Sequence, residues 1–163
     1  MHQAWKRFCP AVMLAAALAV SGVLVGAPEG STPGPDAGSD DRAAIEKVVT
    51  DYIGLYTRTT LDRWRELFHP ALTVVSPGDD GAIRVRALDA FFKAQKDRFE
   101  TGRPVSERLE NVRIDPGWRI ARVSADFVFT DEGRSSRGSL GLHLARANDG
   151  WRIVAILFSY NPV

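Results

Sequence analysis

The sequence predicts an α+β domain in which helices come first and a meander of β-strands follows. Between residues 40 and 104, apolar side chains recur every three or four positions, as on the buried face of a helix. From Val105 onward the apolar period changes to two, which is typical of strands with one buried face. The chain has 163 residues, 45% hydrophobic and 25% charged, so one ordinary globular domain is expected.

The N-terminal segment has the composition of an export signal. Lys6 and Arg7 precede an apolar run over residues 11–25, the order found in secretory signal peptides. We expect residues 1–27 to be removed, with a cut near Ser21 as the alternative cleavage site. The other alternative is an uncleaved N-terminal anchor, for which the run is short. A secreted or periplasmic protein is predicted.

The remaining chain divides into a linker and one domain. Residues 28–39 are rich in Gly, Pro and Ser and offer little apolar surface, so they are expected to be a disordered linker. Residues 40–163 form the predicted domain. The single Cys of the chain, Cys9, leaves with the signal peptide, and a mature protein without thiols suits an oxidising compartment.

The first predicted helix begins at Ser39 or Asp40, whose side chains can cap its free N–H groups. Positions three and four apart along it are apolar, which gives one buried stripe. The stripe consists of Ile45, Val48, Val49, Tyr52, Ile53 and Tyr56.

A short second helix and a strand are expected next. The helix begins at Thr59 or Thr60 and ends at His69-Pro70, because proline disfavours helical geometry in the residue before it. Residues 72–75 read as a strand, and residues 76–81 as the turn that closes it. The apolar residues of the helix are Leu61, Trp64, Leu67 and Phe68.

A third helix precedes the strands. Gly102 marks its end, because a helix C-terminus favours a residue with a left-handed backbone. The buried side is expected to comprise Leu88, Phe91, Phe92, Gln95 and Phe99.

Four strands are predicted over residues 105–115, 119–130, 135–147 and 151–160. Glu132-Gly133 is a plausible two-residue hairpin turn, which would pair Asp131 with Arg134 and place Val123 opposite Leu142. Under this register one face is apolar and contacts the helices, whereas the other is polar. The apolar face carries Ala121, Val123, Ala125, Phe127, Leu140, Leu142 and Leu144; the polar face carries Arg122, Ser124, Asp126, Gly141 and His143.

These elements resemble the nuclear transport factor 2-like superfamily over essentially all of residues 40–163. The resemblance is carried by Tyr52-Ile-Gly-Leu-Tyr56, Trp64-Arg-Glu-Leu-Phe-His-Pro70, Phe127-Val-Phe129 and Gly150-Trp-Arg-Ile-Val154. It implies a SnoaL-like or ketosteroid isomerase-like cone: three N-terminal helices pack on a curved, mainly antiparallel sheet around an interior pocket. It also implies homodimers through the outer sheet face, although fold alone does not choose an activity.

The ketosteroid isomerase branch allows a test by residue. That branch uses a first-helix Tyr as oxyanion donor, an Asp after the first strand as proton shuttle, and a protonated Asp on a later strand. Tyr52 matches the first role, but Ser76 stands at the second, where a hydroxyl cannot shuttle a proton as a carboxylate can. The third position falls near Gly141, Leu142 or His143, none of which is acidic. Steroid-type isomerisation is therefore disfavoured.

The ligand-binding residues expected from this resemblance lie around one mostly apolar hollow. Tyr52 and Tyr56, four positions apart, could direct their hydroxyls at a bound carbonyl or hydroxyl; the alternative is that both are core aromatics. The full set is Tyr52, Tyr56, Trp64, Phe68, Ser76, Phe92 and Phe127.

The candidate catalytic residues are His69, His143 and Tyr52, since imidazole titrates near neutral pH. His69 could instead be a helix-end residue favoured by the helix dipole, and His143 could pack at a dimer surface. No Gly-rich phosphate loop, nucleophile elbow or metal-ligand spacing occurs, so neither metal nor cofactor is expected. A net charge of +1 argues against nucleic acid, and against a membrane beyond the export signal.

Three functions stay open on the sequence. The first is a pocket protein that binds a small apolar molecule through one or two tyrosines, because the predicted pocket is poor in carboxylates. The second is a SnoaL-like lyase, isomerase or hydrolase, with His69 or His143 as base and Tyr52 as oxyanion donor. The third is a dimeric assembly module whose sheet face is the function.

Overall fold

The computed structural model describes residues 38–78 and 80–161. Within them, three helices and six strands follow in the order α1 (Ser39–Gly54), α2 (Leu61–Arg65), β1 (Phe68–Pro77), β2 (Ile83–Ala87), α3 (Leu88–Glu100), β3 (Val105–Asp115), β4 (Ile120–Asp131), β5 (Arg134–Ala147) and β6 (Gly150–Tyr160). The predicted signal peptide, residues 1–27, and almost all of the predicted linker, residues 28–39, lie outside this description. None of the described helices is long and apolar enough to cross a membrane.

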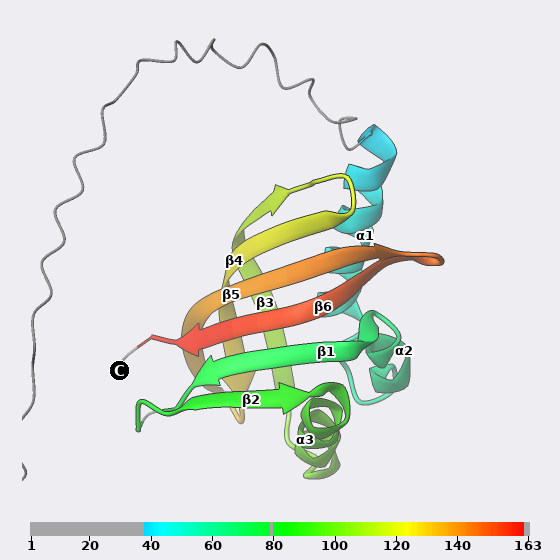
Figure 1. The fold of residues 1–163 in the computed structure, drawn as a ribbon. Coiled ribbons are helices and arrows are strands. Elements are labelled where there is room, and N and C mark those ends of the chain that lie inside the picture. Colours follow the sequence, from blue (N-terminus) through cyan, green and yellow to red (C-terminus); the bar gives the residue numbers. More distant parts are fainter. Residues whose placement is uncertain (1–37, 79, 162–163) are drawn as a thin grey trace, which may run out of the picture. The chain divides into compact units, whose positions relative to one another are not determined.

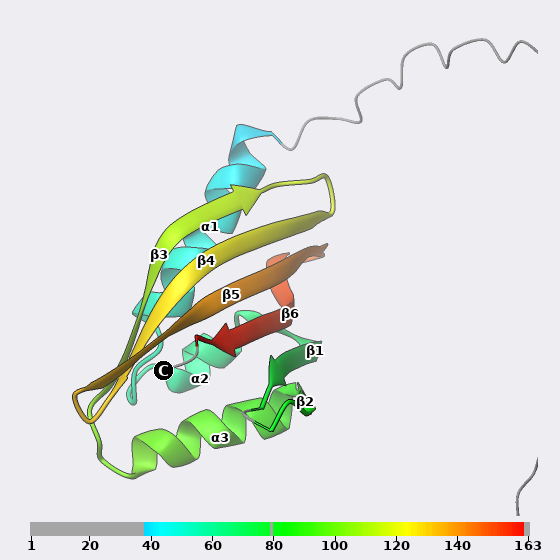
Figure 2. The same cartoon turned by 90° about the vertical axis from the view of Figure 1, so that its left-hand side faces the viewer.

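The six strands form one sheet in the order β2-β1-β6-β5-β4-β3. All neighbouring strands are antiparallel except β1 and β6, which run parallel. Figures 1 and 2 show the helices gathered against one face of this strongly twisted sheet. The α+β prediction, with helices on a mainly antiparallel sheet, is therefore confirmed.

The predicted hairpin of β4 and β5 is confirmed residue by residue. Asp131 pairs with Arg134 and Val123 with Leu142, as the Glu132-Gly133 turn requires. Both turn residues have positive φ, 51° and 77°, the conformation of a tight hairpin that twists with its strands. The predicted apolar face is buried, and four of the five residues on the predicted polar face are exposed, Gly141 being half-buried.

The first helix differs from the prediction at both ends. Gly38 precedes it, and Ser39 and Asp40 lie within its first turn and do not cap it: the Ser39 hydroxyl donates to the Asp40 carboxylate. At the other end Tyr56 lies just beyond the helix, where its backbone N–H donates to Ile53 O at 3.2 Å. The stripe of Ile45, Val49 and Tyr52 is buried, as predicted.

The second helix ends earlier than predicted, at Arg65, because the sheet begins at Phe68. Phe68 pairs with Ile153 of β6, and the Leu67 carbonyl accepts a 2.9 Å hydrogen bond from the Ile153 N–H. Pro70, which has no N–H to donate, lies where the β1–β6 register shifts. His69-Pro70 therefore belongs to a strand and not to a helix end.

Strand β2 and the loop before it correct a further prediction. Ser76 and Pro77 belong to β1 and pair with Arg84 and Ile83, so the turn begins only at Gly78. The third helix then follows β2 directly, and Gly102 takes φ +72° just after its end, as predicted.

Aromatic side chains form the centre of the core beneath the sheet. The Trp64 ring is 1% exposed and lies 4.6 Å from Phe68 and 5.0 Å from Tyr56, measured between ring centroids. Its indole N–H donates to the Tyr52 carbonyl at 2.8 Å, which links α2 to α1. This hydrogen bond helps to hold Tyr52 and Tyr56 at the edge of an internal cavity.

Candidate functional site

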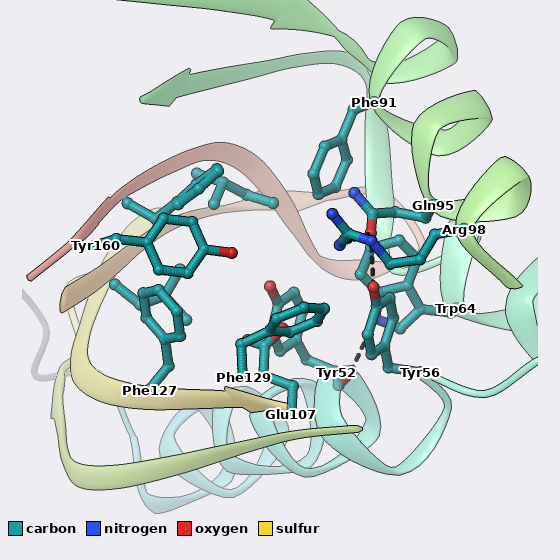
Figure 3. A pocket seen from close by; sticks show the side chains of 13 residues that line it. Tyr52, Tyr56, Trp64, Phe91, Gln95, Arg98, Glu107, Phe127, Phe129 and Tyr160 are labelled. Carbon is teal, nitrogen blue, oxygen red and sulfur yellow. Dashed lines mark hydrogen bonds between the residues drawn. The ribbon is translucent and has the colours of Figure 1, made fainter. Parts of the chain in front are cut away.

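A cavity opens between the helices and the curved inner face of the sheet. The centre of a water molecule could occupy a volume of about 50 Å³ within it. Its wall combines aromatic rings with a small polar group of side chains, as Figure 3 shows. The lining residues are Tyr52, Tyr56, Trp64, Phe91, Gln95, Arg98, Glu107, Phe127, Phe129, Leu140, Ile156, Phe158 and Tyr160.

All three tyrosines of the chain line this cavity. Tyr56 donates a 2.6 Å hydrogen bond to Gln95 Oε1, so its hydroxyl is held by the wall. The hydroxyls of Tyr52 and Tyr160 point into the cavity in Figure 3 and make no hydrogen bond with any described residue. Tyr52 is 5% exposed, whereas Tyr160 is 47% exposed and marks the mouth. Two free hydroxyl groups are thus available to a bound molecule.

Glu107 brings a carboxyl group to the same space. It is the third residue of β3, pairs with Phe129 of β4, and faces inward between Val105 and Leu109. Its carboxylate makes no hydrogen bond or ion pair with the described part of the chain. Burial among the rings raises the pKa of Glu107 from 4.5 to about 7, although the positive charge of Arg98 lowers it.

Burial also keeps the tyrosine hydroxyls protonated. It raises the pKa of Tyr56 to about 12 against the opposing effect of Arg98, and raises the pKa of Tyr52 well above its ordinary value. The negative charge of Glu107 adds to the effect on Tyr52. At the pH where Glu107 gains and loses its proton, Tyr52 is therefore a neutral hydrogen-bond donor.

One glycine shapes the wall beside the mouth. A Cβ at Gly138 would lie 2.1 Å from the Ser159 carbonyl oxygen and 2.5 Å from the ring of Phe127. The bare backbone lets the Phe127 ring lie against the strand, 5.2 Å from Tyr160 and nearly perpendicular to it. These two rings form the sheet side of the entrance.

Comparison with known proteins identifies the family. A model of the SnoaL-like domain matches residues 45–162. The chain belongs to the SnoaL-like domain family. No protein of curated function is detectably similar to it in sequence.

Solved structures share the fold of this SnoaL-like domain at low sequence identity. A nuclear transport factor 2-like protein of unknown function from Shewanella baltica has a TM-score of 0.59 and 16% identity, covering 76% of this chain and 96% of its own. A putative dehydratase from Streptomyces avermitilis has a TM-score of 0.63 and 14% identity, covering 76% and 98%. A putative scytalone dehydratase from Novosphingobium aromaticivorans has a TM-score of 0.60 and 18% identity, covering 76% and 85%. The superfamily expected from the sequence is confirmed.

The predicted ligand-binding residues divide between this cavity and other places. Tyr52, Tyr56, Trp64 and Phe127 line it, as expected. Phe68 packs behind Trp64, and the buried Ser76 accepts a 3.3 Å hydrogen bond from Arg86. Phe92 lines a different hollow, between α2 and α3, with Leu61, Phe99 and several charged residues.

Neither candidate histidine lies in the cavity. His69 is half-buried on β1, and its Nδ1 accepts a 3.1 Å hydrogen bond from the Ala71 N–H. His143 is exposed and pairs with Arg122 and Ala155 on the outer face of the sheet. Neither histidine can therefore act as a base on a molecule bound in the cavity of this SnoaL-like domain.

The expectation of a hollow nearly without ionisable groups was wrong. Glu107 and Arg98 both line it, with Gln95 between Arg98 and Tyr56. The signal for Glu107 was present: Val105, Glu107 and Leu109 alternate with exposed residues, which places a carboxyl group on an apolar face. Arg98 follows Gln95 by three helical positions and so shares its side of α3. Among the described residues no group of three or more acidic, His or Cys side chains could hold a metal ion.

Proposed function

We propose that this SnoaL-like domain is a general acid–base enzyme that moves a proton on a small carbonyl compound. Glu107 is the acid–base group, and Tyr52 donates a hydrogen bond to the carbonyl oxygen. The observation that carries the proposal is the unpartnered Glu107 carboxyl group, which faces the same cavity as the free Tyr52 hydroxyl.

Glu107 has the properties that proton transfer at neutral pH requires. Its pKa of about 7 lets it exist in both protonation states under those conditions. No other described side chain occupies its oxygens by hydrogen bonding, so both are available to a substrate. A carboxyl group of low pKa, paired at the surface, would be a much weaker base.

Tyr52 is suited to the charge that forms during the step. Glu107 takes a proton from the carbon next to the carbonyl. The electron pair of that C–H bond forms a carbon–carbon double bond, and the π pair of the carbonyl moves to its oxygen. The Tyr52 hydroxyl donates to this oxygen as it becomes negative, in surroundings without much competing water. Return of the proton to another carbon gives isomerisation, whereas its delivery to a departing hydroxyl group gives dehydration. Two of the similar solved structures described above are putative dehydratases, a reaction of this class.

The sequence favoured a protein that binds a ligand without converting it, because the predicted pocket was poor in carboxylates. Glu107 removes that reason, and the positions of His69 and His143 remove the histidine-based mechanism. What remains of both hypotheses is Tyr52 as the hydrogen-bond donor to a bound oxygen.

The test is exchange of carbon-bound hydrogen in heavy water. The probe is 2-tetralone, a small aromatic ketone, whose loss of α-hydrogen signal is followed by NMR near neutral pH. We expect the protein to accelerate exchange, Glu107→Gln to lower the catalysed rate by about 100-fold or more, and Tyr52→Phe by about tenfold or more.

The matched controls are His69→Gln and His143→Gln, which change titratable groups outside the cavity and should leave the rate unchanged. A Glu107→Gln variant that exchanges hydrogen as fast as the original protein would refute the role of Glu107. Binding of the ketone without any accelerated exchange would favour the ligand-binding function instead.

A further inference from the structure

Two arginines adjoin the cavity without an acidic partner. Arg98 of α3 lines the cavity, and Arg86 of β2 lies against two of its aromatic walls. Neither makes an ion pair within 4.0 Å with a carboxylate of residues 38–78 or 80–161, where eleven other ion pairs occur. Arg65 shows the contrast: it also stacks on a phenylalanine ring, yet it pairs with Asp89 at 2.5 Å.

Most of the hydrogen-bonding capacity of Arg98 is unused. One of its terminal nitrogens donates to Gln95 Oε1 at 3.3 Å, and the guanidinium lies 4.8 Å from the centre of the Phe129 ring. Arginine has five N–H donors in a flat fork that matches a carboxylate. Figure 3 shows this fork directed into the cavity.

Glu107 does not neutralise Arg98. The two side chains line the same cavity but do not approach within 4.0 Å. Near neutral pH, burial also leaves a large fraction of Glu107 protonated and uncharged. The polar part of the wall is then positive. Arg98 is half-buried, and a charge that is partly shielded from water is stabilised by an anionic partner.

Arg86 adds a second positive charge behind the wall. Its guanidinium lies 5.8 Å from the ring centres of both Phe91 and Phe158, which line the cavity. One nitrogen donates to the Ser76 hydroxyl at 3.3 Å, but Nε is buried and has no hydrogen-bond partner among the residues that the structure describes. Burial raises the pKa of Tyr160; the charges of Arg98 and Arg86 oppose that rise, whereas those of Glu107 and Asp131 add to it. Both arginines therefore act on the mouth of the cavity.

We infer that the molecule taken up by this cavity is a small organic anion, whose carboxylate pairs with Arg98 while its flat apolar body lies among the aromatic rings. A carboxylate supplies the partner that residues 38–78 and 80–161 do not provide, and the positive charge of Arg86 strengthens its attraction. The inference deepens the proposed function and rests on it for the role of the cavity: the substrate carries a carboxylate as well as the reacting carbonyl group. It adds a charged group to the small apolar molecule expected from the sequence.

The test compares benzoate with benzamide, which has nearly the same shape but no charge. Binding is measured by calorimetry and by the fluorescence of Trp64, whose ring lines the cavity. We expect benzoate to bind at least about tenfold more tightly, as a charge-assisted pair implies. Equal affinities, or no benzoate binding at millimolar concentration, would overturn the inference.

Substitution of the arginines locates the charge that is responsible. Arg98→Gln should weaken benzoate binding by about tenfold and leave benzamide unaffected, and Arg86→Gln should act in the same direction with a smaller effect. Arg98→Lys keeps the charge and should retain part of the preference, which provides the test if the glutamine variant does not fold. Arg65→Gln is the matched control and should change nothing. A preference for benzoate that persists in Arg98→Gln would refute the pairing.

The pH dependence separates this inference from the proposed function. As Glu107 ionises between about pH 6 and about pH 8, it competes with the ligand for Arg98, so benzoate affinity should fall. The other titratable groups around Glu107 are Tyr52, Tyr56 and Tyr160, whose raised pKa values keep them neutral over this range. In Glu107→Gln, benzoate binding should become nearly independent of pH while hydrogen exchange is lost. If the protein does not prefer benzoate but still catalyses Glu107-dependent hydrogen exchange, the anion site alone is refuted. If it prefers benzoate but catalyses no such exchange, only the catalytic role is refuted.

Discussion

Replacing Glu107 with glutamine should change how the stability of the protein depends on pH. Its pKa rises from 4.5 in the unfolded chain to about 7 in the folded state, mainly because burial disfavours the charged form. Between these two values the folded protein binds the proton that the unfolded chain has already released. The free energy of unfolding therefore falls as pH rises through this interval, and it changes no further above about pH 7.

The size of the effect follows from the same shift. A pKa difference between 4.5 and about 7 corresponds to about 3 kcal/mol, which is a large part of the stability of an ordinary domain. Glutamine cannot ionise, so the variant avoids this loss. Relative to the original protein, Glu107→Gln should become more stable by about 3 kcal/mol on going from about pH 4.5 to about pH 8.

Urea unfolding, followed by tryptophan fluorescence at several pH values, gives the free energy of unfolding of both proteins. In the difference between them, the pH effects of all other titratable groups cancel. Glu110, on the same strand, provides the matched control. Its carboxylate accepts hydrogen bonds from Arg108 and Arg137, which lower its pKa, so it is ionised throughout this pH range. The Glu110→Gln difference should therefore be flat above about pH 5. A Glu107→Gln difference that is equally flat would show that this carboxyl group is not buried as described.

Two further predictions concern the wall and the outer face. Gly138→Ala should lower the free energy of unfolding by about 1–3 kcal/mol and disturb the entrance, because its Cβ would lie 2.5 Å from the Phe127 ring. Thermal unfolding measures this effect, and an unchanged melting temperature would contradict it. Val85 and Leu157 are 64% and 44% exposed and lie on the uncovered sheet face, so we expect two copies to pair there. Leu157→Asp should then give a monomer in sedimentation, whereas Ala44→Asp, on the exposed side of α1, should have no effect. Identical masses for all three proteins would disprove the pairing.

The parts of the fold that the sequence predicted are those in which local signals agree. In β4 and β5 the turn at Glu132-Gly133 and the alternation around Val123 and Leu142 agree on the same register. A slip by one residue would turn the apolar side chains to the outer face. Strand β2 gave no such signal, because Ile83 and Val85 are exposed at the edge of the sheet instead of facing the core. The start of β1 was also missed, since it depends on Ile153, more than eighty positions away.

The site was predicted for its aromatic part and missed for its polar part. Tyr52 and Trp64 follow a helical stripe that any buried face would show, so their place in the wall could be inferred. Glu107 and Arg98 are single charged residues that share a face with apolar ones. The alternation around Glu107 indicates that face, but charged residues are ordinarily assigned to the surface. Only the approach of α3 to the inner face of the sheet shows that both enter the same cavity.

The position of β6 determines when this cavity can first exist during synthesis. This strand lies between β1 and β5, and it bears Phe158 and Tyr160 near its end. Among the described strands it is the last to leave the ribosome, so until then β1 and β2 have no edge to join and the mouth lacks one side. A nascent chain that ends before β6 would contain Glu107, Arg98, Tyr52 and Tyr56, yet it would have no closed cavity in which to use them.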